Sequence, residues 1–264
     1  NYTGQVFDEE EDELPSDIGS VSGGNDYYNI LPNLTLQWDV NDELNFNFAF
    51  TQSIARPSYY DLVPYEYSNS DDQELALGNP DLKASLSTNF DIMGEWYFGG
   101  LSLLSFGYFS KDIKDWIYQY TTNNYTYAGV NGYELSQLRN GEKASVSGFE
   151  LGFQTKFLKN FTFMGNYTST DSSTNNVEGR DDVPLTGQVD DMYNLSLAFE
   201  NSKFFVRASM NYASEALDEL SGDAYEDRYY DEQTFVDVNA NYKVNDKLSI
   251  FAEGKNLTNQ PLRY

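Results

Sequence analysis

Hydrophobic and polar residues alternate with a period of two along much of the chain. The clearest run opens residues 44–64, LNFNFAFTQSIARPSYYDLVP, where every second side chain from Leu44 to Phe50 is apolar. Strict alternation over several residues predicts a β-strand with two unlike faces. Six further segments repeat the pattern and are expected to be strands: 34–40, 90–98, 149–157, 193–199, 206–212 and 236–242. The apolar positions of all seven segments carry no charged side chain.

The connections between these segments alternate between short and long. The short connections are expected at 41–43, 99–100, 159–160, 201–202 and 243–246, and the long, polar ones at about 53–86, 121–141, 171–189 and 213–231. This order places all short turns at one end of the strands and all long loops at the other. An antiparallel transmembrane β-barrel has this asymmetry, together with an apolar outer face and a polar lumen.

A soluble β-sandwich or a β-propeller is the alternative, because its strands also alternate, with the polar face in water. Three features favour the barrel: strand lengths of about ten residues, the absence of a blade repeat of about 40 residues, and the excess of Phe and Tyr at strand ends, where aromatic girdles lie. In the barrel interpretation, Phe46, Phe48 and Phe50 face lipid. The segment SIARPSYYDLVPY, residues 53–65, then begins an external loop.

Composition narrows the function classes. The chain has 16 Lys and Arg against 42 Asp and Glu, a net charge of −26, which would repel a nucleic-acid backbone. It has no cysteine and no histidine, which excludes thiolate and imidazole metal ligands and every Ser/His or Cys/His nucleophile within these residues. No stretch approaches the ~18–20 consecutive apolar residues of a membrane-spanning helix. The first 26 residues hold eight acids and no Lys or Arg, so no signal peptide is visible.

Two acidic clusters are candidates for cation binding. Residues 8–13 read DEEEDE, and acids also concentrate between Glu215 and Asp231. Carboxylate oxygens are ligands for divalent cations, but such runs are more often solvated, mobile loop tips. We therefore expect no resident metal or cofactor, and a substrate that is not strongly anionic.

Several motifs resemble the barrel of TonB-dependent outer-membrane receptors. Residues 53–64 are followed by Gly78-Asn79-Pro80-Asp81-Leu82-Lys83, in the order in which that family places an Arg-Pro-x-Tyr-x-x-Leu-x-Pro element before a Gly-Asn-Pro-x-Leu-Lys element. The stretches 109–117, 146–151, 184–188 and 253–259 are also similar to the family, in its usual order. The resemblance therefore covers nearly everything after Tyr27, and is strongest to receptors that scavenge carbohydrates and siderophores.

The resemblance implies that residues 1–264 are the C-terminal portion of a barrel in the bacterial outer membrane, with about ten of 22 strands. The family's plug domain and TonB box are not recognisable here, and its final strand should follow Tyr264, because a barrel with both ends on the periplasmic side needs one more strand downward. Expected partners are outer-membrane lipid, the TonB-ExbB-ExbD system through the missing N-terminal part, and a surface substrate-binding lipoprotein.

The candidate site residues fall into two groups. The first lies in the Arg-Pro element and could stack on a sugar or an organic chelator: Arg56, Tyr59, Tyr60, Asp61 and Tyr65. The alternative is that these residues only anchor the loop to the barrel rim. The second group consists of charged residues expected to line the lumen and to pair with one another or with a plug: Asp91, Glu95, Glu150, Lys156, Arg207 and Asp237.

Three function classes stay open. The favoured one is active import, in which the receptor binds a scarce nutrient, an oligosaccharide or a ferric siderophore, and passes it inward with TonB-coupled energy. A passive porin is the second class, distinguished by the lack of a plug. The third is an outer-membrane hydrolase, which the absence of histidine disfavours. We therefore expect a transporter and not an enzyme.

Overall fold

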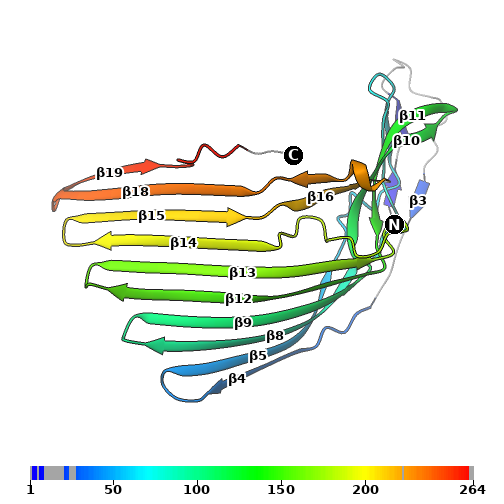
Figure 1. The fold of residues 1–264 in the computed structure, drawn as a ribbon. Helices are drawn as coiled ribbons and strands as arrows, with labels where there is room; N and C mark the ends of the chain where they lie inside the picture. The colour runs from blue at the N-terminus through cyan, green and yellow to red at the C-terminus, as the bar shows by residue number, and fades with distance from the viewer. Residues whose placement is uncertain (1, 5, 9–20, 24–27, 222, 262–264) are drawn as a thin grey trace.

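The computed structural model describes residues 2–4, 6–8, 21–23, 28–221 and 223–261. Ten long strands form one antiparallel sheet in the order β19-β18-β15-β14-β13-β12-β9-β8-β5-β4. In Figure 1 these strands run side by side across the view, with the short turns at their left ends. Their bounds are β4 (Asn33–Asp39), β5 (Leu44–Ala55), β8 (Ser85–Phe98), β9 (Ser102–Lys114), β12 (Lys143–Phe157), β13 (Phe161–Asn175), β14 (Asp191–Glu200), β15 (Phe204–Ala213), β18 (Gln233–Asn245) and β19 (Leu248–Gly254).

The strand pairing confirms the predicted division into two faces. Directly opposite residues of an antiparallel pair share one face of a sheet. Phe48 lies opposite Leu36 and Ile92. Likewise, Val238 lies opposite Ala208 and Gly254. Apolar positions therefore line up from strand to strand and form one continuous apolar face, while the polar positions form the other.

The apolar face forms a band with an aromatic row at each end. Towards the short turns, Phe161 lies between Phe157 and Phe199, with ring centroids 5.6 and 5.0 Å away. At the other end, Tyr167 lies opposite Tyr193, and Tyr193 lies opposite Tyr212. Beyond these tyrosines the next residues on the same face are Ser169, Asp191 and Ser214. Along β15 the band runs from Phe204 to Tyr212, about the nine residues that a tilted strand needs to cross the hydrocarbon core.

A second sheet of seven strands lies at the long-loop end, and we call it the cap sheet. Its order is β17-β16-β10-β11-β7-β6-β2, and Figure 1 shows β10 and β11 of this sheet standing across the right-hand ends of the long strands. Its strands are β2 (Val6–Asp8), β6 (Glu66–Asn69), β7 (Glu74–Leu77), β10 (Ile117–Tyr127), β11 (Val130–Asn140), β16 (Ala216–Ser221) and β17 (Arg228–Tyr230). Two short strands, β1 (Tyr2–Gly4) and β3 (Val21–Gly23), pair separately.

The cap sheet corrects several predicted boundaries. Residues 121–141 were expected to be a loop, but most of them belong to the β10–β11 hairpin, which leaves the long sheet at Asp115, a residue with a positive φ of 51°. Strand β5 continues through Ser53 to Ala55, because it pairs with β8 up to Ser85. Strand β18 extends to Asn245, so the last short turn is 246–247. Three pairs in the cap sheet are parallel, β10–β16, β11–β7 and β2–β6, which the sequence did not indicate.

The buried core lies at the cap end of the molecule and not along the middle of the long sheet. One cluster joins Trp116, Tyr118, Ala144, Val177, Val183, Leu217 and Leu220. A smaller one joins Leu75, Tyr133 and Leu135. By contrast, outward side chains of the long sheet such as Leu36 and Phe106 remain 60% and 53% exposed. An exposed apolar face of this extent needs an apolar environment. None of the helical turns among the described residues is long and apolar enough to cross a membrane.

Candidate functional site: the cap sheet and the polar face

The Arg-Pro element and the Gly-Asn-Pro element fold against each other. The amide of Gly78 donates to the carbonyl oxygen of Tyr65 (2.9 Å), and the amide of Asn79 donates to that of Asp61 (2.9 Å). A Cβ on Gly78 would lie 1.8 Å from the carbonyl oxygen of Val63, so only glycine fits there. Leu62 and Leu82 are buried beside them, at 7% and 1% exposure. These residues therefore hold the loop in place.

The Gly-Asn-Pro element is also tied to the cap sheet. The side-chain amide of Asn79 donates to the carbonyl oxygen of Leu138 (2.8 Å), and the amide of Lys83 donates to the side-chain oxygen of Asn140 (2.8 Å). Asn140 in turn donates to the carbonyl oxygens of Lys83 and Asp115. Two amide side chains thus join the loop after β5 to β11.

The five predicted substrate residues separate into exposed and anchored side chains. Tyr59 and Tyr60 are 81% and 67% exposed. The ring of Tyr60 lies 4.9 Å from that of Tyr65, and burial, with Tyr60 and Asp61 nearby, raises the pKa of Tyr65. Asp61 accepts from the amide of Ser58 (3.1 Å) and shapes the turn. Arg56 is exposed at the start of the same loop.

The segment between β13 and β14 links two parts of the cap sheet. Glu178 accepts from the Tyr118 hydroxyl (2.7 Å) and from Nη1 of Arg139 (2.9 Å). Two residues further on, Arg180 donates to both oxygens of Asp227 (2.8 and 3.1 Å). Asp227 is almost buried, with 6% of its side chain exposed, and its hydrogen bond raises the pKa of Arg180. The segment therefore fixes β10–β11 and β16–β17 to each other.

The prediction that the acidic segment 215–231 is a solvated, mobile loop tip is wrong. It contains β16, a 3₁₀ turn at Ala224–Glu226 and β17, and Leu217 and Leu220 lie in the core. Arg228 forms ion pairs with Asp218 (2.7 Å) and Glu219 (2.8 Å). The part of the chain that the structure describes contains no group of three or more His, Cys, Asp or Glu that could hold a metal ion. The other acidic cluster falls largely at 9–13, outside the described residues.

The six charged residues predicted for the lumen all lie on the polar face of the long sheet. Asp91 is opposite Phe109, Glu150 is opposite Gly107, and Arg207 is opposite Asn239. None of the six forms an ion pair within the described ranges, so the structure does not pair them with one another. Asp237 instead accepts from the amide of Asn256 (2.8 Å). That these residues line a lumen stays a prediction.

Sequence reasoning did not single out a groove of uncharged groups on the same face. Its volume is about 420 Å³, and its polar lining consists of Ser105, Gln154, Asn166, Asn194, Ser196, Ser209 and Asn211. Asn194 donates to the side-chain oxygen of Asn166 (2.8 Å). Amides and hydroxyls can both donate and accept hydrogen bonds without attracting counter-ions. The concentration of Asn and Ser at the polar positions of β13, β14 and β15 was the available signal.

The long sheet has an apolar band with an aromatic row at each end, and its short turns lie opposite a folded cap. These features define the wall of an outer-membrane β-barrel. Its two edge strands, β4 and β19, do not pair with each other, so the wall formed by the described residues is open. The family model described as TonB dependent receptor-like, beta-barrel matches residues 7–257. The chain belongs to this family of bacterial outer-membrane receptors, and its cap sheet is therefore extracellular.

The chain is similar to several named relatives. It is 26% identical over 193 residues to the iron-regulated outer membrane virulence protein of Vibrio cholerae, covering 71% of this chain and 29% of that protein. Among solved structures, the ferric enterobactin receptor PfeA of Pseudomonas aeruginosa matches with a TM-score of 0.66 at 19% identity, covering 86% of this chain and 34% of that one. The siderophore receptor PirA of Acinetobacter baumannii matches with a TM-score of 0.62 at 18% identity, covering 86% and 36%.

The chain thus spans about a third of the length of these relatives. Because the identity to the solved structures is low, those matches show the fold alone. That residues 1–264 form the C-terminal portion of a 22-stranded barrel stays a prediction.

Proposed function

We propose that the receptor containing this chain takes up a ferric siderophore across the outer membrane with TonB-coupled energy. The observation that carries the proposal is a lipid-facing wall joined to a firmly folded extracellular cap. The similarity to a protein named as iron-regulated supports iron as the cargo. Nothing in the structure or the relatives favours an oligosaccharide or a passive porin.

The proposal assigns different roles to the two halves of the Arg-Pro element. Leu62, Gly78 and Asn79 hold the loop, whereas the rings of Tyr59 and Tyr60 are exposed. Aromatic faces stack on planar or apolar parts of an organic ligand. We assign the first contact with the siderophore to these two rings, which lie in the same loop as Arg56.

Two kinds of partner follow from the proposal. Energy reaches the barrel from the TonB-ExbB-ExbD system through the plug and TonB box that the family places before the barrel. A surface lipoprotein that delivers substrate, also predicted from the sequence, stays a prediction.

The test is uptake by the full-length receptor in a strain lacking its own siderophore receptors. Cells are supplied with radioactive iron in a panel of ferric chelates, and in parallel with labelled oligosaccharides, with and without TonB. We expect accumulation of one class of ferric chelate that stops when TonB is removed. Uptake that continues without TonB indicates a porin, and uptake of oligosaccharide alone contradicts the assigned cargo.

The contact residues are tested with Tyr59→Ala and Tyr60→Ala in the same receptor. Loss of one stacked ring should weaken binding of the transported chelate about 2- to 10-fold. Tyr67→Ala is the matched control, because Tyr67 is a 40% exposed tyrosine of the cap sheet outside the element. Equal affinities in all three variants would show that the element only anchors the loop.

A further inference from the structure

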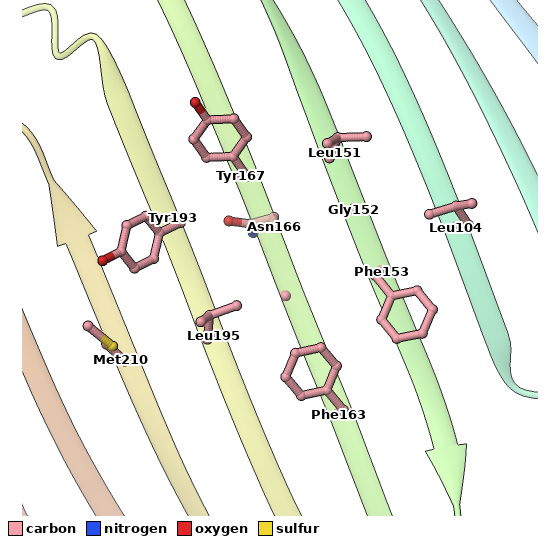
Figure 2. A pocket seen from close by; sticks show the side chains of 11 residues that line it. Leu104, Leu151, Gly152, Phe153, Phe163, Asn166, Tyr167, Tyr193, Leu195 and Met210 are labelled. Atoms are coloured by element: carbon pink, nitrogen blue, oxygen red, sulfur yellow. The ribbon is translucent and has the colours of Figure 1, made fainter.

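The lipid-facing side of the long sheet contains a groove on its outer half. Figure 2 shows the rings of Tyr167 and Tyr193 on one side of it and those of Phe153 and Phe163 on the other. Gly165 also lines the groove. Leu104, Leu151, Leu195 and Met210 complete its apolar lining. The groove holds about 620 Å³ and spans five strands, β9, β12, β13, β14 and β15.

The groove exists because Gly165 has no side chain. Gly165 lies on the apolar face, opposite Phe153 on β12 and Leu195 on β14. The neighbouring apolar positions on its own strand are Phe163 and Tyr167, both large rings. A Cβ at Gly165 would meet Cδ2 of Leu195 at 2.9 Å and little else within 3.5 Å, so a larger side chain would fill the space once Leu195 turns aside.

The position of the groove identifies the leaflet. Gly165 is one outward position from Tyr167 in the extracellular aromatic row, and two from Phe161 in the periplasmic row. The groove is continuous with the lipid-facing band, so its occupant must be apolar. Asp171, Asp190 and Asp191 lie beyond the tyrosines and do not line the groove, so the contact is with hydrocarbon and not with a headgroup.

We propose that this groove is a binding site for one acyl chain of lipopolysaccharide, the glycolipid of the outer leaflet. The chain lies along Gly165, between the two tyrosine rings and the two phenylalanine rings. Ordinary annular lipid exchanges freely along a smooth apolar surface, whereas a chain that lies in the depression at Gly165 also contacts the rings that border it. The site should therefore retain its lipid through purification.

The test is native mass spectrometry of the full-length receptor purified from outer membranes in mild detergent. We expect wild-type protein to carry a bound lipopolysaccharide, and Gly165→Leu to carry at least tenfold less. Ala240→Leu is the matched control, because Ala240 lies on the same face of β18, outside the groove, and gains the same side chain. This control should retain as much lipid as the wild type.

A second variant covers the case in which Gly165→Leu does not fold. Met210→Phe narrows the groove from β15 without changing a glycine, and should also lower retention. The proposal is contradicted if the wild type retains no lipid, if it retains phospholipid instead, or if the folded groove variants retain as much lipopolysaccharide as Ala240→Leu.

Discussion

Gly78 shows how closely two segments of the extracellular cap approach each other. Because a Cβ there would lie 1.8 Å from the carbonyl oxygen of Val63, Gly78→Ala must push the backbone at position 78 away from the backbone at Val63. We expect the loop between β5 and β8 to become sensitive to protease added to intact cells. Tyr59→Ala, at an exposed position of the same loop, should leave protease resistance unchanged. Equal resistance in both variants would show that the close approach is not needed.

Tyr118 makes the cap sensitive to alkaline pH. Burial, followed by its hydrogen bond to Glu178, raises the pKa of its hydroxyl above the ordinary value of 10.0. The unfolded chain then loses this proton at lower pH than the folded chain, so the contribution to stability is complete below pH 10 and falls as the pH rises above it.

The measurement for Tyr118 uses a cysteine in place of Ala144, a buried member of the same core cluster. The rate at which this cysteine reacts with a thiol reagent above pH 10 reports opening of the cluster. We expect the rate to rise more steeply with pH in the otherwise unchanged receptor than in one that also carries Tyr118→Phe. Identical pH dependence in the two proteins would contradict the assignment.

At the scale of elements, the segment between β13 and β14 fixes the cap through Arg180 and Asp227. Removing one partner of a buried ion pair costs about 3–5 kcal/mol, because the other charge remains buried without compensation. We expect Asp227→Asn to lower the free energy of opening of β16 and β17 by this amount, and so to accelerate hydrogen exchange of their amides. Asp218→Asn is the control, because its partner Arg228 is half exposed, and such pairs contribute about 0–1 kcal/mol. Similar exchange in both variants would exclude the predicted role.

The strands that the sequence predicted share one property, a clean alternation that local sequence alone can show. β9 was not among them, because Leu103 and Leu104 are adjacent, and Phe109 lies on the polar face opposite Asp91. β13 was missed for a related reason, since Met164 lies on the polar face and Gly165 on the apolar one. Alternation predicts a strand only where each face is uniform.

The cap sheet could not be predicted as one sheet, because its hairpins are joined to one another by pairs between segments far apart in the chain. β11 pairs in parallel with β7, and β10 pairs in parallel with β16, about 100 residues later. The polar stretches 121–141 and 213–231 therefore became strands through partners that local composition does not reveal. The sequence singled out Tyr59 and Tyr60, whose contact with a substrate stays a prediction, but not the anchoring contacts of Gly78 and Asn79.

At the scale of the whole molecule, the cap lies outside the cell and the short turns lie in the periplasm. The chain has no cysteine, so single cysteines can report position in a receptor whose other cysteines, if any, have been replaced. We expect Tyr225→Cys and Asp181→Cys, in the exposed cap, to react with an impermeant reagent on intact cells. Leu101→Cys and Ser202→Cys, in exposed short turns, should react only after the outer membrane is permeabilised. The opposite labelling would invert the topology.

The central claim is that one face of the ten-stranded sheet lies in lipid and the other does not. It is tested most directly by the unfolding free energy of arginine variants of the full-length receptor in lipid vesicles. The lipid-face variants are Phe48→Arg, Leu195→Arg and Val238→Arg, each compared with its chain neighbour on the polar face, Asn47→Arg, Ser196→Arg or Asn239→Arg.

Arginine on the lipid face near the bilayer midplane destabilises a barrel by about 2–4 kcal/mol. The account predicts a loss of this size at the three lipid-face positions and a clearly smaller loss at each neighbour, where the guanidinium can reach water. Equal losses within all three pairs would contradict the assignment of the faces, and with it the placement of this chain as the wall of an outer-membrane receptor.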